Sequence, residues 1–443
     1  MPAGPERWPV VRERGVSWRL GGDAFFRSES GLSRDLGCLA LAVRMREKGL
    51  GEGAGGGGEA ETGVAVLEAF AGSGSRGVRY AAHLPPGSLL WSNDADASLG
   101  PTLVYNLAQS ERERERERES EGEDSEGLCR QARRVTTRVT HEDVRALLYG
   151  CFVRSERFGV VDLDGFGSAG VAVCGVACGV VEDDGLVYVA GTDAATVAGG
   201  HNAGSALGSY GGAHCVSKLP FASEQGMRVF LYAVVQAAAA QGRDAFPLFS
   251  HYSGHGPVFR TMLRVRRGKP APSGGMVGSV GYMRYCGACG NAGSVDTSAL
   301  GGECFASCPS CGAHGTTQVA GPLWIGDLHE REFLARMREE ADRLGWTRED
   351  PRGNESALGR ELAVMEEEVG PGAPEGVAFH IPLDRIASHA RLRGTPPRDA
   401  LLAALPFDAC RTSFDTKAIR CGAPLDAIAA AWYDAQNGGS GDV

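Results

Sequence analysis

The hydrophobic residues of this chain form short runs that alternate with polar turns and with segments of helical spacing. The clearest run is Phe158–Leu163, an apolar and partly β-branched stretch that leads directly into Asp164, Gly165 and Phe166. A run of this kind is typical of a strand buried on both faces of a parallel sheet. Ligands of open α/β sheets bind at the carboxyl ends of such strands, so the pattern predicts a site at Asp164.

Asp164 and Phe166 suit a planar base that carries an amino group. The carboxylate can accept hydrogen bonds from an exocyclic amine, and the aromatic ring can stack on the base. The same residues also fit an ordinary strand end closed by a glycine turn. The pattern alone leaves both interpretations open.

An earlier strand and its loop predict a nucleotide-type ligand. Residues 64–70 have the pattern of a strand, and the small residues 72–74 form a loop before a helix that begins near Ser75. Small residues allow the backbone of such a loop to approach a ligand closely. The next strand ends in Asp94, about twenty residues after the loop, and this spacing suits a carboxylate that binds the ribose hydroxyls of a nucleoside cofactor.

Strands and helices continue to alternate after this unit. Residues 135–140 predict a strand followed by an acidic loop at Asp143, which suits an adenine amino group. The alternation predicts an α/β fold with a doubly wound, Rossmann-like sheet. We expect this domain to span residues 21–270, after a disordered N-terminus of residues 1–20. A smaller zinc-containing α+β domain is expected over residues 271–443.

Residues 110–134 interrupt the first domain. Glu and Arg alternate at the start of this segment, a pattern that fits either a salt-bridged helix or a disordered stretch. Residues 111–127 contain no apolar side chain that packs in a core. We therefore expect a solvated insertion that loops out of the domain.

Four cysteines form the most specific motif in the chain. Cys286 and Cys289 make one CxxC pair, and after eighteen intervening residues Cys308 and Cys311 make a second. Two such turns place four thiolates tetrahedrally around one metal ion and leave no open position for chemistry. The motif therefore predicts a structural Zn²⁺ site. Cys304 lies between the pairs and is left outside the ligand set.

The last part of the chain predicts a helix, a linker and a small module. Residues 327–344 have the spacing of an amphipathic helix, and residues 350–375 are acidic and glycine-rich, as in a linker. Two short helices then begin near Leu383 and Pro397, and a turn or hairpin begins at Arg411. This order resembles a winged-helix unit, and it fits either a substrate-binding appendage or structural padding.

Composition narrows the class of protein and its compartment. Of 443 residues, 43% are hydrophobic, which is ample for two cores, and no apolar run reaches the length of a membrane span. The net charge of −10 does not indicate that the surface as a whole attracts nucleic acid, but it is compatible with a local basic face. Thirteen cysteines without a signal peptide indicate a reducing compartment, so the nucleus and the organelles both stay open.

Taken in order, these motifs resemble the tRNA (guanine-26,N2)-dimethyltransferase family of class I S-adenosylmethionine-dependent enzymes. The resemblance extends from about Phe25 to Trp432 and rests on the whole series rather than on one motif. The matching elements are Arg34-Asp35-Leu36, residues 73–76, Arg79-Tyr80, Asn93-Asp94, Asp143, residues 162–167, Thr192-Asp193, Tyr210-Gly211, Glu224 with Arg228, the paired CxxC, residues 321–324 and residues 411–414.

The resemblance implies transfer of methyl groups from S-adenosylmethionine to the exocyclic N2 of guanine 26 in tRNA. It implies tRNA as the partner, and no membrane and no obligate protein partner are evident in the sequence. Phe166 and Asp164 match the positions that the family uses for the target base, and we expect them to be catalytic. The positions that match its cofactor site are Arg34, Arg76, Asp94 and Asp143, with Gly74 in the loop between them.

One departure from the family lies inside the catalytic motif. The family has Pro where this chain has Gly165, and glycine must lose more backbone entropy to hold the same turn. Two alternatives therefore stay open beside the dimethyltransferase. The chain is compatible with a catalytically weakened, tRNA-binding paralogue and with an amino-methyltransferase that acts on another nucleic-acid base.

Overall fold

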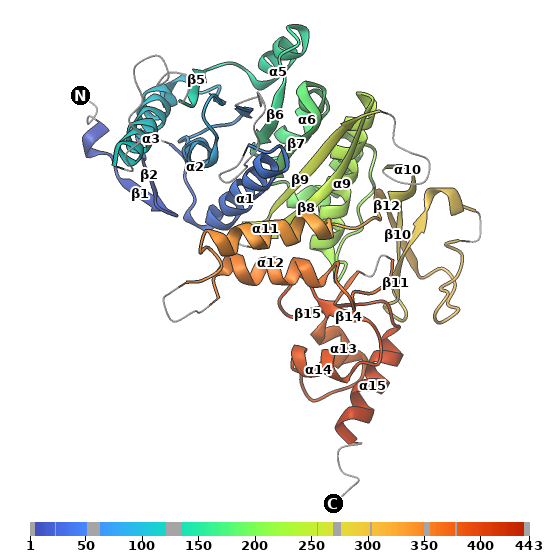
Figure 1. Cartoon of the computed structure of the whole chain (residues 1–443). Helices are drawn as coiled ribbons and strands as arrows, with labels where there is room; N and C mark the ends of the chain where they lie inside the picture. The colour runs from blue at the N-terminus through green and yellow to red at the C-terminus, as the bar shows by residue number, and fades with distance from the viewer. Residues whose placement is uncertain are drawn as a thin grey trace, which may run out of the picture. The chain divides into compact units, whose positions relative to one another are not determined.

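A computed structural model of the chain shows two compact units (Figure 1). The first unit comprises residues 1–190, 262–267 and 335–360, and the second comprises residues 191–261, 268–334 and 361–443. The structure describes residues 5–22, 24–50, 63–120, 134–254, 256–268, 276–301, 304–349, 355–376 and 379–437.

A parallel sheet with the buried strand β6 (Phe158–Leu163) at its centre forms the first unit. The strand order of the sheet is β5-β4-β3-β6-β7-β9-β8, and the neighbours from β5 to β7 all pair in parallel. The chain moves outward along the sheet in one direction from β3 and in the other from β6, so right-handed crossovers put helices on both faces. The structure confirms the doubly wound α/β fold. The other strands are β3 (Ala65–Glu68), β4 (Leu89–Asn93), β5 (Thr136–Thr140), β7 (Val181–Gly191), β8 (Arg243–Ser253) and β9 (Val258–Arg267).

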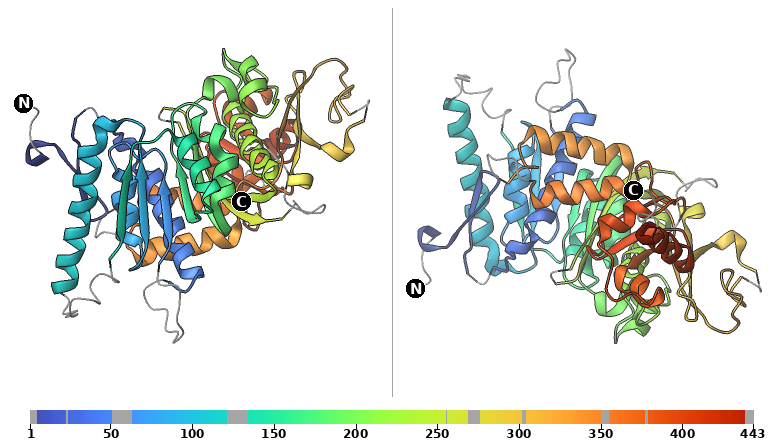
Figure 2. Two further views of the ribbon diagram at one scale, coloured as in Figure 1. Left: turned by 90° about the horizontal axis from the view of Figure 1, so that it is seen from above. Right: turned by 90° about the horizontal axis from the view of Figure 1, so that it is seen from below.

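In the part of the chain that the structure describes, five helices pack around the parallel strands. The helices α1, α2 and α3 pack against one another in series, and α5 packs against α6 (Figure 2). Their bounds are α1 (Gly31–Glu47), α2 (Ser75–His83), α3 (Gly100–Ser120), α5 (Val144–Val153) and α6 (Ala169–Val180).

The N-terminal residues are ordered from Pro5 onward, so the prediction that residues 1–20 are disordered is wrong for the part that the structure describes. Strands β1 (Val10–Glu13) and β2 (Val16–Arg19) form an antiparallel hairpin. Trp18 on β2 is buried, and Glu13 on β1 accepts hydrogen bonds from Arg34 and Arg79. These long-range contacts fix a segment that has little local preference for structure.

The predicted insertion begins as a regular continuation of α3, which runs to Ser120. Arg114 donates a hydrogen bond to the carbonyl of Leu84 at 2.8 Å, and Glu113 accepts one from Gln109 at 3.1 Å. The segment therefore does not loop out at its start: its alternating charges lie on a helix, and Glu115 pairs with Arg134 beyond it. The remainder of the segment, residues 121–133, lies outside the described residues.

Within the described residues, the second unit contains the long helix α9, strand β8 and the start of β9 from the seven-stranded sheet, the small sheet β11-β10-β12, and a C-terminal module with the small sheet β13-β15-β14. Residues 262–267 of β9 belong to the first unit. Strand β8 was missed by the sequence analysis, because its mixture of polar and aromatic residues has no regular alternation. Two short helices followed by a hairpin, as predicted, form the module. The elements are α7 (Ala194–Val197), α8 (Ala206–Ser209), α9 (Ala222–Ala240), β8 (Arg243–Ser253), β9 (Val258–Arg267), α10 (Met276–Ser279), β10 (Val280–Cys286), β11 (Ala292–Asp296), β12 (Thr317–Trp324), β13 (His380–Pro382), α13 (Leu383–His389), α14 (Arg398–Ala404), β14 (Ala409–Arg411), β15 (Ala418–Cys421) and α15 (Leu425–Asn437).

Two helices contribute residues to both units. The first, α11 (Arg331–Arg343), lies within the predicted amphipathic segment. The second, α12 (Ala357–Glu367), lies where the sequence predicted a linker, so that prediction is wrong. Leu358, Leu362 and Met365 are fully buried at spacings of four and three residues, and they form an apolar stripe that the surrounding acidic residues concealed.

A buried cluster of charges joins distant segments of the second unit. Glu224 on α9 is inaccessible to solvent and pairs with Arg228 at 2.8 Å and with Arg420 at 2.7 Å. Arg420 also pairs with Glu368 at 2.9 Å, and His380 lies 2.9 Å from Glu224. Burial alone would raise the pKa of Glu224, but Arg420 and Arg228 outweigh it and hold the pKa well below its ordinary value. We call these residues the Glu224 cluster.

We predict that Glu224→Gln destabilises the protein by about 3 kcal/mol or more, because two guanidinium groups then lose a buried counter-charge. The lowered pKa adds a pH dependence. The stabilisation is present above the unfolded pKa of Glu and is lost as the pH falls through the lower folded value. Denaturant titrations at several pH values measure both effects.

Glu367→Gln is the matched control for this variant. Glu367 pairs with Arg411 where its side chain is 39% exposed, so its loss should cost less than about 1 kcal/mol. Equal destabilisation by the two variants would show that the Glu224 cluster contributes no more than a surface ion pair.

Candidate active site

The predicted catalytic carboxylate and a predicted cofactor residue lie in direct contact. Arg76, near the start of α2, donates from Nε to Asp164 Oδ2 at 2.8 Å and from Nη2 to the same oxygen at 2.7 Å. Asp164 follows the last residue of β6 and is one quarter exposed, whereas Arg76 is almost fully buried. The guanidinium therefore orients a carboxylate that remains accessible from the carboxyl edge of the sheet.

A second buried carboxylate completes this ion pair. Asp162 on β6 lies 3.5 Å from Arg76 Nη1 and accepts a short hydrogen bond from the hydroxyl of Tyr80. Arg76 also donates to the hydroxyl of Ser33 at 3.3 Å. Burial would lower the pKa of Arg76, but Asp164 and Asp162 raise it well above its ordinary value, so the guanidinium is always charged. Sequence analysis had assigned no role to Asp162 or Tyr80, although both belong to the quoted motifs.

The predicted stacking residue is accessible. Phe166 is 68% exposed, and its ring meets the exposed ring of Phe25 edge-on at a centroid distance of 5.1 Å. Phe25 had not been predicted as a site residue, and a sequence offers no signal that it would reach Phe166 from so far along the chain. Two exposed aromatic rings beside a carboxylate form a surface suited to a planar ligand.

The glycine loop and Asp94 also come together. Asp94 follows β4 and accepts a hydrogen bond from the backbone N–H of Gly72 at 2.8 Å. Gly74 caps α2 in the left-handed region at φ 75°, where other residues are strained. A Cβ on Gly72 would meet nothing within 4 Å, so a ligand can approach the loop there. The carboxylate and the open loop fit the polar part of a nucleoside cofactor.

Glu68 lies beneath the loop at the end of β3 and makes no contact with solvent. It accepts hydrogen bonds from Gly77 N–H at 3.1 Å and from the hydroxyl of Ser92 at 2.7 Å. Burial raises the pKa of Glu68 to about 8; the hydrogen bond from Ser92 lowers it, and the nearby Asp162 raises it, but both effects are smaller than that of burial. At neutral pH this side chain is a neutral packing group that supports the start of α2.

Two predicted cofactor residues have other partners in this structure. Arg34 is buried and donates to Glu13 and to the carbonyl of Arg27 at 3.0 Å. Asp143 caps α5 by accepting from Arg145 N–H at 2.9 Å, and its side chain is half exposed. The Arg145 guanidinium lowers the pKa of Asp143. Among the described residues, no hydrogen bond or ion pair joins either one to Asp94.

The four predicted metal ligands form one cluster in the second unit. The sulfurs of Cys286, Cys289, Cys308 and Cys311 all lie within 4.8 Å of one another. Cys286 Sγ is 3.8 Å from Cys311 Sγ, and Cys289 Sγ is 3.6 Å from Cys308 Sγ. A tetrahedron with zinc–sulfur bonds of about 2.3 Å has edges of about 3.8 Å, so the four thiols fit Zn²⁺.

In the part of the chain that the structure describes, no helix combines the length and the apolar character needed to span a membrane. The long apolar helix α9 (Ala222–Ala240) carries buried charges instead.

Comparison with known proteins links the chain to one family. The family model described as N2,N2-dimethylguanosine tRNA methyltransferase matches residues 20–433. A tRNA (guanine(26)-N(2))-dimethyltransferase from Schizosaccharomyces pombe is 28% identical over 77% of this chain, which spans 58% of that relative's length. One from Methanosphaerula palustris is 30% identical over 66% of this chain and 71% of its own.

A solved structure has the same fold over almost the whole chain. Trm1 from Pyrococcus horikoshii, solved with S-adenosyl-L-methionine, superposes with a TM-score of 0.68 at 18% identity. The match covers 96% of this chain and 99% of that one. The α/β sheet and the region with the cysteine cluster therefore both belong to a known architecture.

We predict that the cysteine cluster holds one Zn²⁺ that stabilises the second unit and does no chemistry. Cys289→Ser should lower the zinc content and the melting temperature together, because metal binding contributes to folding free energy. Cys304→Ser is the control, since Cys304 contacts only its neighbouring backbone among the bonds described, at Ala299 O and Gly301 N. Zinc far below one atom per chain in the purified wild-type protein would contradict the prediction.

Proposed function

The chain belongs to the N2,N2-dimethylguanosine tRNA methyltransferase family, and from this premise we propose that it transfers methyl groups from S-adenosylmethionine to N2 of guanine 26 in tRNA. The resemblance seen in the sequence motifs is thereby confirmed at the level of the family. The observation that carries the proposal is the Asp164–Arg76 pair beside two exposed aromatic rings, on the sheet edge that also presents Asp94.

Asp164 is proposed to accept the hydrogen bonds of the target amino group. The N2 lone pair of guanine is delocalised into the ring, so the amine is a weak nucleophile. A carboxylate that holds the amine protons favours a pyramidal nitrogen and later takes the proton that the product loses. Arg76 keeps this carboxylate in one orientation, and Asp162 and Tyr80 keep Arg76 in place.

Phe166 is proposed to stack on the target base, with Phe25 as its edge-on support. Stacking on an exposed ring contributes roughly 1–3 kcal/mol for each base and fixes the plane in which the amine lies. Positioning of this kind lowers the barrier because the reacting atoms are held in line before reaction.

Asp94, Gly72 and Gly74 are proposed to hold the cofactor, whose sulfonium supplies an electrophilic methyl group. The carboxylate of Asp94 suits the ribose hydroxyls, and the loop leaves open space at Gly72. Arg34 and Asp143 are retained as proposed cofactor contacts through their match to the family. In this structure Arg34 already binds Glu13, so its contribution would be to position α1.

Nucleoside mass spectrometry tests the proposed function directly. Wild-type protein with S-adenosylmethionine should convert guanosine 26 of a tRNA transcript to its N2-methylated forms, and a transcript with adenosine at position 26 should stay unmodified. Methylation of both transcripts would favour an enzyme for another base. Cofactor and tRNA binding without product would favour the weakened paralogue.

We predict that Asp164→Ala lowers turnover by roughly two or more orders of magnitude, the usual scale for a positioned proton acceptor, and leaves cofactor affinity largely unchanged. Asp94→Ala should instead weaken cofactor binding, as measured by calorimetry. If Asp164→Ala retains the wild-type rate, the end of β6 is not the catalytic centre.

Gly165 offers a separate prediction about the turn. A Cβ at this position would lie 3.1 Å from Phe70 Cζ and 3.2 Å from Ala169 Cβ, which is closer than most such contacts. Gly165→Pro alone should therefore lower both turnover and melting temperature, although proline fixes φ and reduces the entropy that folding removes. Gly165→Pro combined with Phe70→Leu should recover both.

Phe70→Leu alone is the control, because it measures the cost of the smaller side chain. An unchanged turnover in Gly165→Pro would show that Phe70 moves aside easily and that the departure from the family is neutral.

A further inference from the structure

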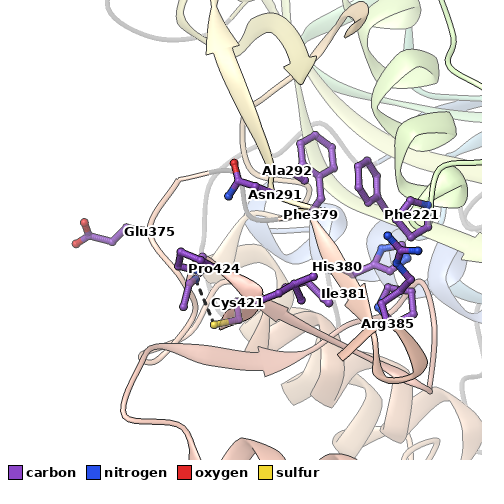
Figure 3. Close-up of a pocket in the computed structure, with 16 residues that line it drawn as sticks. Phe221, Asn291, Ala292, Glu375, Phe379, His380, Ile381, Arg385, Cys421 and Pro424 are labelled. Carbon is purple, nitrogen blue, oxygen red and sulfur yellow. Dashed lines mark hydrogen bonds between the residues drawn. The ribbon is translucent and has the colours of Figure 1, made fainter. Parts of the chain in front are cut away.

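Two adjoining cavities in the second unit are lined partly by residues of the C-terminal module. One is a chamber of about 170 Å³ between the cysteine loop and β13, lined by Asn291, Glu375 and Arg385 among others (Figure 3). The other is an open groove of about 910 Å³ that contacts α13 and the β14–β15 turn. Pro220, Pro382 and Arg385 line both, so the two cavities are adjacent.

The groove gathers positive charge on a chain of net charge −10. Four cations, Lys218, Arg385, Arg398 and Lys417, line it together with two acids. We call these four residues the basic groove.

Three of the four cations keep their charge available. Arg398 pairs with Asp399 at 3.1 Å, whereas Arg385 donates only to the hydroxyl of Tyr285, at 2.7 Å, in the contacts described. Lys218 and Lys417 form no ion pair with any carboxylate that the structure describes. Although Asp384 and Asp415 also line the groove, basic side chains without ion-pair partners in a concave surface favour a polyanionic ligand.

Lys218 is also held in an unfavourable backbone conformation. Its φ is +60°, in the left-handed region, which costs a non-glycine residue roughly 1 kcal/mol or more. Glycine would remove this strain. The presence of lysine here is therefore explained better by its exposed ammonium group than by the stability of the turn.

The chamber suits one planar polar group. Its volume is below the roughly 300 Å³ of a pocket for a drug-sized ligand. Phe221 and Phe379 stack on each other at 4.7 Å and give the chamber a rigid, buried wall. Asn291 brings an amide to the lining, whereas the carboxylate of Glu375 points away from the other labelled residues (Figure 3). An amide of this kind recognises the hydrogen-bonding edge of a nucleobase.

We propose that the basic groove and the chamber bind a single-stranded segment of the RNA substrate, with phosphates on Lys218, Arg385 and Lys417 and one unstacked base in the chamber. An acidic protein segment would satisfy the cations but would leave the amide of Asn291 and the aromatic wall of the chamber without a planar partner. The proposal rests on the proposed function for the identity of the RNA. It assigns a contact with the RNA to the second unit.

The phosphate part is tested by the salt dependence of tRNA binding, measured by fluorescence anisotropy. Each lost phosphate contact on a single strand should reduce the slope of log K against log salt by about 0.7, which is about fivefold in affinity at 0.1 M salt. The double variant Lys218→Gly with Lys417→Ala should thus bind tRNA about 25-fold more weakly. Arg331→Ala is the control, because Arg331 is an exposed residue that lines neither cavity.

Lys218→Gly also separates binding from stability. This variant should keep or raise the melting temperature while it weakens tRNA binding, because it removes both the strain and the charge. A loss of binding that accompanies a lower melting temperature would indicate a structural role for Lys218 and would count against the proposal.

The base part is tested with Asn291→Ala. This variant should weaken tRNA binding without changing the salt slope, since it removes a neutral group. Wild-type slopes and affinities in all variants would overturn the proposal, as would displacement of tRNA by polyglutamate at concentrations where single-stranded RNA also displaces it.

Failure of this proposal is distinguishable from failure of the proposed function. Methylation of guanosine 26 at saturating tRNA and S-adenosylmethionine affinity should be unchanged in every groove variant. If the groove variants keep the wild-type salt slope while the wild-type protein methylates guanosine 26, only the proposal about the groove is wrong. If the wild-type protein does not methylate tRNA but the groove variants still reduce the salt slope, the proposed function is wrong and the RNA-binding groove stands.

Discussion

The geometry of the candidate active site depends on one buried guanidinium. Arg76 lies between Asp162 and Asp164, and burying either carboxylate without it would leave an uncompensated charge at the end of β6. The position of Arg76 depends in turn on the start of α2, which Gly74 sets with a left-handed cap that other residues adopt only under strain. Arg76, which follows the glycine loop, and the proposed catalytic residue Asp164 are thus held together by one ion pair, although they lie 88 residues apart.

The sequence predicts those features of the site that depend only on residues close together in the chain. Strand β6 follows from an apolar run, the glycine loop from its small residues, and Asp94 from its spacing after that loop. The partners of each charge do not follow, because they come from contacts across the sheet or across the chain. Arg34 binding to Glu13, and Phe25 reaching Phe166, both depend on an N-terminal hairpin whose own sequence has little periodicity.

The second unit shows the same division. Its cysteine pairs reveal the metal site because four ligands in two turns require little knowledge of the fold. The Glu224 cluster, by contrast, joins residues 224, 368, 380 and 420, and its charges look like ordinary surface residues until the fold buries them. The buried stripe of α12 was hidden in a similar way by acidic neighbours. Long-range burial, rather than local propensity, decided each of these cases.

The charge balance around Arg76 connects the fold to the proposed chemistry. Burial, with a smaller contribution from the nearby Asp162, raises the pKa of Glu68 to about 8, so at neutral pH this side chain adds no charge to the site. Arg76 then faces two ionised carboxylates with one positive charge, and the pair remains net negative where Asp164 is accessible. A net negative edge favours a cationic sulfonium ligand over its neutral thioether product. If Glu68 were also ionised, Asp162 would face a second buried carboxylate and the start of α2 would be destabilised. At neutral pH, Glu68 therefore leaves the charge at this edge of the sheet to Asp162, Asp164 and Arg76.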